Sequence, residues 1–278
     1  MWLGKTLCIA TQHNKERVLG PLFENLLGLT LIQDISLNTD ILGSFCGETE
    51  RKCTPIEALR QKCKLAALQT NANFIVSSEG SFGPHPNIPF LYANEEFLMF
   101  YDKKNASEII AHELFFETNF SSDSCTEWNQ VVEFCKRVKF PEHAVILKSS
   151  VLKPKKIVKG ISNFKDLKIQ FKRFIKSQPL VYIETDMRAL YNPTRMNNIE
   201  RLGRRLINKI TSLCPFCNWP GFEIQRVIRG LPCKFCLQPT NSIVTCVWKC
   251  THCLFEKTSP GNLIQPFVDP QFCNVCNP

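Results

Sequence analysis

The sequence has no apolar run approaching the roughly 18 residues that a membrane-spanning helix needs. It also lacks the start typical of exported chains, because Met1-Trp-Leu-Gly-Lys-Thr6 is not a charged segment followed by a long apolar stretch. These absences argue against a membrane-spanning or exported protein. We therefore expect a cytoplasmic protein that does not bind membranes.

Cysteine, by contrast, is abundant, with 15 in 278 residues. In a small exported chain this number would predict disulfides, but a chain without an export signal favours reduced thiols and metal binding. Eight cysteines form four Cys-x-x-Cys knuckles: Cys214 and Cys217, Cys233 and Cys236, Cys250 and Cys253, Cys273 and Cys276. We expect these knuckles to form a zinc-ribbon-type module.

Two knuckles can supply the four sulfurs of one tetrahedral ion, so four knuckles predict two Zn²⁺ ions. A closed Cys₄ site leaves no position for water, and we therefore expect both ions to be structural. The gaps between successive knuckles are 15, 13 and 19 residues. These gaps leave sequential, nested and interleaved pairings of the knuckles open.

Strand and helix patterns alternate before the knuckles. Leu3–Ala10 is strand-like, and Thr54-Pro-Ile-Glu57 is a capping box that predicts a helix to about Gln69. Asn73–Ser78 is a second apolar strand, which ends at Glu79. The pattern predicts an α/β domain over residues 1–212, with a mixed sheet and flanking helices, and the zinc module over residues 213–278.

Positive charge is concentrated between Lys153 and Lys176, which accounts for most of the net charge of +9. Nine basic residues there face one acid, Asp166, so the segment contributes 9 − 1 = +8. Phe164, Leu167 and Phe171 recur at helical spacing. The segment is interpreted either as a solvated helix face or as an electropositive flank that binds nucleic acid.

The whole chain resembles a bacterial protein family of unknown function with a C-terminal four-knuckle zinc module. The signatures that carry this resemblance are Glu79-Gly-Ser-Phe-Gly-Pro-His-Pro86, Glu184-Thr-Asp-Met-Arg188, Asn192-Pro-Thr-Arg195 and a terminal Cys276-Asn-Pro.

Residues 5–212 are also similar in motif order to the pyrophosphatases of noncanonical purine nucleoside triphosphates, which have the inosine triphosphatase-like fold. The matching residues, in chain order, are Ala10-Thr-Gln-His-Asn-Lys15, Thr54, Glu57, Arg60, Lys62, Glu79-Gly80, Arg188 and Arg195. Ser77-Ser-Glu-Gly80 stands where that family more often has Asp-Asp-Ser-Gly. No second acid beside Glu79 is identified from the sequence.

This second resemblance implies a Mg²⁺-dependent hydrolase that releases pyrophosphate from nucleoside triphosphates. Glu79 and Lys62 would then be catalytic. The expected phosphate-binding residues are Asn14, Lys15, Arg60, Arg188 and Arg195. Glu79, with Glu48 or Asp186, would hold Mg²⁺. The alternative is a non-enzymatic zinc protein that binds nucleotides or nucleic acid, the latter through Lys153–Lys176.

Overall fold

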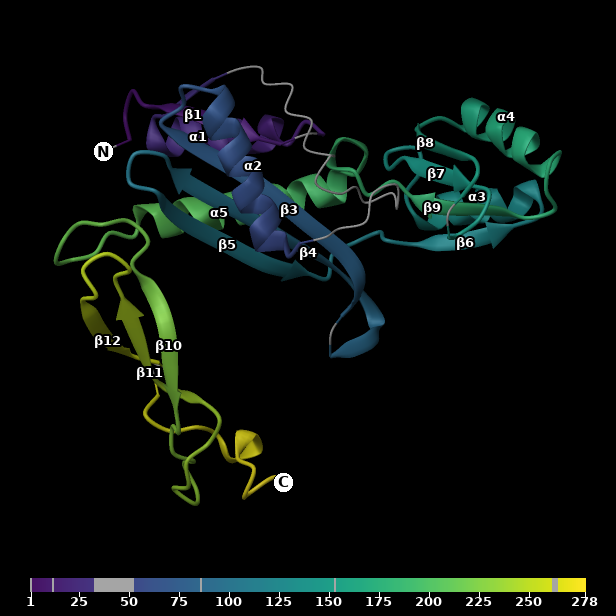
Figure 1. Cartoon of the computed structure of the whole chain (residues 1–278). Coiled ribbons are helices and arrows are strands. Elements are labelled where there is room, and N and C mark those ends of the chain that lie inside the picture. The colour runs from purple at the N-terminus through teal and green to yellow at the C-terminus, as the bar shows by residue number, and fades with distance from the viewer. Residues whose placement is uncertain (1, 12, 33–52, 86, 153, 262–264) are drawn as a thin grey trace. The chain divides into compact units, whose positions relative to one another are not determined.

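The computed structural model describes the chain except for residues 1, 12, 33–52, 86, 153 and 262–264 (Figure 1). The described chain divides into two compact units, Met1–Ile207 and Asn208–Pro278, which we call unit 1 and unit 2.

The first sheet of unit 1 has five strands in the order β2-β1-β3-β4-β5. Strand β1 lies between two parallel neighbours, whereas β3, β4 and β5 pair antiparallel, so the sheet is mixed. Its strands are β1 Thr6–Ala10, β2 Thr30–Leu31, β3 Phe74–His85, β4 Ile88–Asp102 and β5 Ser107–Phe115. The predicted α/β class with a mixed sheet is confirmed.

Three helices cover this sheet: α1 (Glu16–Leu27), α2 (Pro55–Gln69) and α5 (Pro193–Thr211). Helix α2 lies over one face, and α1 and α5 lie over the other (Figure 1). Helix α2 begins where predicted, because Thr54 and Glu57 bond reciprocally to each other's backbone N–H. On the opposite face, Phe23 of α1 stacks on Phe100 of β4 with ring centroids 6.2 Å apart.

A second sheet, entirely antiparallel, completes unit 1. Its order is β6-β9-β7-β8, and helices α3 and α4 pack on it around a separate apolar core. The elements are β6 Ser122–Cys125, α3 Trp128–Arg137, β7 Val145–Lys148, β8 Ile157–Ile161, α4 Phe164–Ile175 and β9 Val181–Thr185. The sequence patterns did not predict this second sheet, because strands of four or five residues do not specify which neighbours they pair with.

Unit 2 is built on three antiparallel strands in the order β10-β11-β12. They span Glu223–Arg229, Ile243–Lys249 and Glu256–Pro260. Two short 3₁₀ turns, Ala189–Tyr191 in unit 1 and Pro270–Phe272 in unit 2, complete the described elements. None of the described helices combines the length and apolarity that crossing a membrane requires.

The stacked phenylalanines give a direct test of the first core. Phe100 is 2% exposed, whereas Phe90 on the same strand is 89% exposed. We expect Phe100→Ala to lower the free energy of unfolding by about 3–5 kcal/mol, because it leaves a cavity between α1 and the sheet. The matched Phe90→Ala should change it by less than about 0.5 kcal/mol in urea titrations. Equal effects of the two variants would contradict the assigned core.

Candidate functional site

The strand topology of unit 2 brings the four knuckles together in alternating pairs. Each strand of an antiparallel sheet carries the chain to the opposite end, and one strand separates each knuckle from the next. The first and third knuckles therefore meet at one end, and the second and fourth at the other. The pairing is interleaved, one of the three arrangements that the spacing left open.

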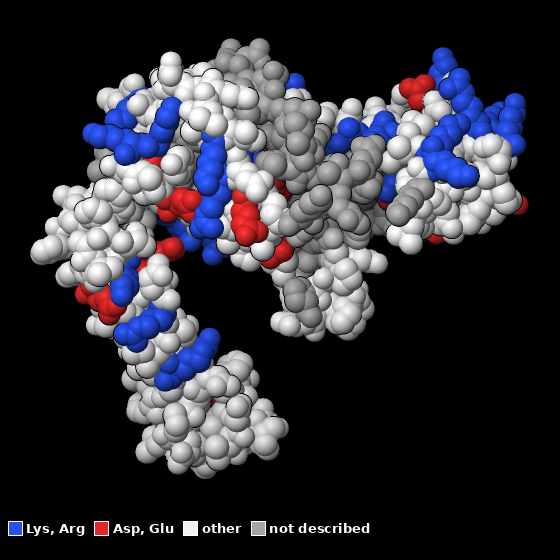
Figure 2. All heavy atoms as spheres, in the orientation of Figure 1, with Lys and Arg blue, Asp and Glu red and all other residues white. Residues whose placement is uncertain are grey.

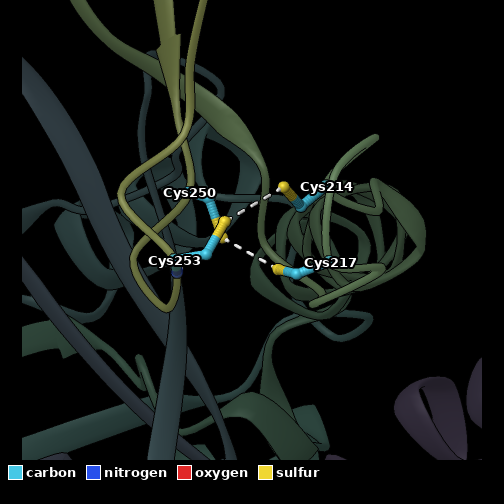
Figure 3. Close-up of side chains that lie close together, drawn as sticks. All are labelled: Cys214, Cys217, Cys250 and Cys253. Carbon is cyan, nitrogen blue, oxygen red and sulfur yellow. Dashed lines mark hydrogen bonds between the residues drawn. The ribbon is translucent and has the colours of Figure 1, made fainter.

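Each pair of knuckles forms a Cys₄ cluster whose four sulfur atoms all lie within 4.8 Å of one another. In the first cluster, Sγ of Cys214 lies 3.7 Å from that of Cys253, and Sγ of Cys217 lies 3.6 Å from that of Cys250 (Figure 3). In the second cluster, the corresponding distances are 3.9 Å for Cys233 and Cys276 and 3.6 Å for Cys236 and Cys273.

These distances fit tetrahedral metal coordination. With metal–sulfur bonds of about 2.3 Å, the edges of a sulfur tetrahedron measure about 3.8 Å. Disulfide sulfurs would lie only about 2.05 Å apart. The eight cysteines are therefore separate thiols in geometry ready for two metal ions.

The same turn shapes all four knuckles. The residue after each second cysteine donates its N–H to the carbonyl of the first cysteine, at 2.9, 3.0, 3.2 and 2.8 Å in chain order. In three knuckles this residue has a positive φ: 56° at Asn218, 62° at Leu237 and 63° at Leu254. Leucine rarely adopts this backbone conformation, so the turn imposes a cost that bonding to the metal would offset.

The thiols of one cluster cannot all ionise together without a cation, since like charges disfavour one another. In the second cluster, the backbone N–H groups of Cys276 and Val275 lower the pKa of the Cys273 thiol to about 7. The hydrogen bond with Cys236, and then burial, raise the pKa of Cys276 to about 12. A divalent ion at the centre would favour the thiolate form of all four.

In unit 1, several predicted residues meet where β3 passes the start of α1 and the middle of α2. Lys15, which precedes α1, donates from Nζ to Ser78 Oγ at 2.7 Å. Lys62 of α2 donates to the Ser78 carbonyl at 2.9 Å and pairs with Glu79 at 2.5 Å. Lys15, Lys62 and Glu79 are all less than 10% exposed. The structure thus gathers three residues that lie far apart in the sequence.

Arg195 joins this group from the first turn of α5. Its Nε donates to Glu96 on β4 at 2.7 Å, and one terminal nitrogen donates to the Met187 carbonyl at 2.6 Å. Both members of the ion pair are 1% exposed. Gly80 permits this approach, because a Cβ there would lie 2.6 Å from the guanidinium and from both carboxylate oxygens.

The resulting charge cluster contains Lys15, Lys62, Glu79, Glu96 and Arg195, with a formal charge of 3 − 2 = +1. Each carboxylate has a cationic partner, but in the described part of the chain Lys15 has a hydroxyl partner and no carboxylate within ion-pair distance. Burial, followed by the charge of Arg195, lowers the pKa of Lys15 from 10.5 to about 7. The cluster therefore has one cation without a matching anion.

The other predicted residues lie outside the charge cluster or are committed elsewhere. Arg60 faces away and pairs with Glu108 of β5 at 2.9 Å. Arg188 pairs with the buried Asp186, which also accepts the N–H groups of Gly160 and Arg188. Asp186 is thereby surrounded by hydrogen-bond donors. Glu48 lies outside the described residues.

Asn14 precedes Lys15 in a turn with unusual backbone geometry. His13 and Asn14 both have positive φ, 70° and 58°. Two successive residues of this kind carry backbone strain, which is common at functional sites. The turn sets the position of Lys15 at the start of α1.

Glu96, the second acid of the cluster, was not predicted from the sequence. Asn94 and Glu96 occupy alternate positions of β4, so both face the same side, where Asn94 donates to Glu96 at 2.9 Å. Asn198 of α5 in turn donates to Asn94. The available signal was that Asn94 and Glu96 share their alternate positions with the apolar Leu98 and Phe100 further along β4.

The fold and the sulfur clusters together define an α/β protein with a C-terminal cysteine-rich module suited to two metal ions. The chain belongs to the family described as a domain of unknown function, DUF6671, whose model matches residues 62–278. Comparisons with curated proteins and with solved structures give no match. They therefore add no support for the resemblance to purine nucleoside triphosphate pyrophosphatases.

The interleaved pairing predicts how metal content responds to double substitutions. Cys214→Ser with Cys250→Ser removes two ligands from one cluster, so one of two bound ions should be lost. Cys214→Ser with Cys233→Ser damages both clusters, so both ions should be lost or weakened. Elemental analysis of the purified full chain measures this, with Cys246→Ser, which lies outside both clusters, as the control. Loss of both ions from the first variant and one from the second would contradict the pairing.

The lowered pKa of Lys15 predicts a pH-dependent stability difference. Because the folded value is about 7 and the ordinary value is 10.5, the unfolded chain binds more protons between these limits. The cost of burying the ammonium is full below pH 7 and disappears as pH rises through 10.5. Lys15→Met should therefore be more stable than wild type by a few kcal/mol near pH 6, and less so near pH 10. A pH-independent difference in urea titrations would contradict the shift.

Proposed function

We propose that this protein hydrolyses nucleotides by binding their phosphates at the charge cluster of unit 1, and that two structural Zn²⁺ ions hold unit 2 together. One observation carries the first part: Lys15 is a buried ammonium that bonds to a hydroxyl and, among the described residues, pairs with no carboxylate. A buried cation is costly without a matching charge, and a phosphate oxygen would supply that charge.

Phosphate fits this cluster better than a carboxylate ligand does. Lys15 and Lys62 are both joined to Ser78, through its hydroxyl and its carbonyl, so the two ammonium groups flank one residue. Arg195 adds a third cation, partly neutralised by Glu96. Although Glu79 also pairs with Lys62, three cations gathered in one cluster would match the multiple negative oxygens of a phosphate chain.

The hydrolytic part of the proposal rests on the resemblance in motif order. In the reaction, water adds to the α-phosphorus of a nucleoside triphosphate, the bond to the bridging oxygen breaks, and a nucleoside monophosphate and pyrophosphate are formed. Glu79 would accept a hydrogen bond from the attacking water and orient it. Lys62, Lys15 and Arg195 would offset the charge that develops on the phosphate oxygens.

In this proposal, Mg²⁺ binds together with the nucleotide and not to the protein alone. Asp186 is already surrounded by hydrogen-bond donors, whereas Glu79, the other predicted Mg²⁺ ligand among the described residues, belongs to the charge cluster. Magnesium sites in nucleotide enzymes often need one or two carboxylates plus the substrate's phosphates. Bound in that way, the ion would supply charge neutralisation on the phosphate chain.

The proposed zinc follows from the donor set. Four sulfurs with tetrahedral spacing suit a soft ion such as Zn²⁺ and leave no open position for substrate or water. Chemistry at the clusters is therefore not expected. Zinc binding would instead contribute folding free energy to unit 2.

The test is to incubate the full chain with a panel of standard and altered nucleoside triphosphates, with and without Mg²⁺, and to measure pyrophosphate release. We expect turnover that falls about 100-fold or more in Glu79→Gln, because this variant loses the carboxylate that orients water. The exposed Glu133→Gln is the matched control and should leave the rate unchanged.

A binding measurement separates phosphate binding at the charge cluster from hydrolysis. Calorimetry with inorganic pyrophosphate should show binding that weakens in Lys15→Met but not in Arg60→Gln, because Arg60 lies outside the cluster. Binding without turnover would identify the non-enzymatic nucleotide-binding alternative. Absence of both would overturn the proposal.

A further inference from the structure

Helix α4 presents a straight stripe of lysines. Lys165, Lys168, Lys172 and Lys176 follow one another at intervals of three, four and four residues, which places them on one helix face. All four are exposed. At about 1.5 Å of rise per residue, the stripe extends over roughly 16 Å. Figure 2 shows Lys and Arg side chains gathered over this part of unit 1.

The charge of this stripe is not balanced locally. Asp166 is the sole acid on α4, and its carboxylate accepts a hydrogen bond from the side chain of Asn163 at 2.6 Å. Within the described chain, none of the four lysines has a carboxylate at ion-pair distance. Lysines four residues apart on a helix repel each other, so the stripe destabilises the helix that carries it.

Helix α5 offers an internal comparison, because its exposed basic residues are paired. Arg201 pairs with Glu117 at 3.3 Å, Arg204 with Glu200 at 2.8 Å and Arg205 with Glu113 at 2.9 Å. The two helices are both amphipathic and both basic. They differ in that nearby acids neutralise the charges of these α5 arginines, whereas no described carboxylate pairs with the four α4 lysines.

We propose that the α4 lysine stripe binds the sugar–phosphate backbone of double-stranded nucleic acid, without sequence preference. A row of ammonium groups matches a row of phosphates, and affinity comes from counterion release. A single strand would need exposed aromatic rings for base stacking. Next to the stripe, Trp128 lies beneath Lys168, and Phe164, although 43% exposed, already packs edge-on against Phe140.

The packing of α4 disfavours an anionic membrane as the partner. A helix that lies on a bilayer inserts its apolar face among the acyl chains. The apolar face of α4 consists of Leu167, Phe171 and Phe174, which are all buried in the core of the second sheet. The side chains that α4 leaves exposed are mostly polar, with Phe164 and Ile169 as its partly exposed apolar residues.

The experiment measures binding of the full chain to a random-sequence DNA duplex of 20 base pairs by fluorescence anisotropy, at several salt concentrations. We expect wild type to bind, with affinity falling steeply as salt rises. Replacing all four lysines with glutamine should weaken binding at least tenfold and make the salt dependence shallower, because up to four phosphate contacts are lost. The variant should remain folded, since the change removes repulsion.

The matched control replaces Arg201, Arg204 and Arg205 of α5 with glutamine and should bind DNA like wild type. Unchanged binding in the α4 variant, or equal loss in the α5 control, would overturn the proposal. So would binding to vesicles containing phosphatidylserine but not to the duplex. Such vesicle binding would be expected to depend on Val151 and Leu152, which are exposed on the loop between β7 and β8. The nucleotide panel is independent of this test, because the stripe lies outside the charge cluster.

Discussion

The buried ion pair between Arg195 and Glu96 is the interaction on which the arrangement of unit 1 depends. It joins the first turn of α5 to the middle of β4, two segments separated by 99 residues. Removing one partner of such a pair costs about 3–5 kcal/mol, because the other charge is left buried and unmatched. The remaining bonding capacity is met by the Met187 carbonyl and by Asn94. The pair also commits Glu96 to Arg195, so among the described residues Lys15 has no carboxylate within ion-pair distance.

Unit 2 is held together by different means. The core around its first cluster contains few fully buried side chains, Cys214, Phe222 and Cys250, with Trp219, Trp248 and Phe255 packed around them. Every residue of β10 from Ile224 to Arg229 is exposed. A unit of this size with so little buried apolar surface needs another source of stability, and small domains commonly obtain it from metal coordination. The two Cys₄ clusters, one at each end of the three strands, fit that role.

Local signals in the sequence predicted local structure well. The Thr54 capping box gave the start of α2, and the four knuckles gave the two sulfur clusters. Non-local pairing could not be predicted in the same way. Glu96 and Arg195 meet only through the packing of α5 on the first sheet, across 99 residues of sequence. Short strands such as β7 carry no mark of the sheet they join. The pairing of the knuckles depends on the antiparallel strands that separate them, and the spacing of the cysteines does not specify those strands.

The proposed phosphate site depends on Lys15 being a buried cation whose charge a bound anion would match. The most direct test is a pH titration of the lysine side-chain carbon resonances of the full chain by NMR, with Lys15→Met to assign the signal. The account predicts that this lysine titrates at about pH 7 and that added pyrophosphate moves the midpoint upward, because a bound anion favours the ammonium form. A midpoint at the ordinary value of 10.5, or one that pyrophosphate leaves unchanged, would contradict it.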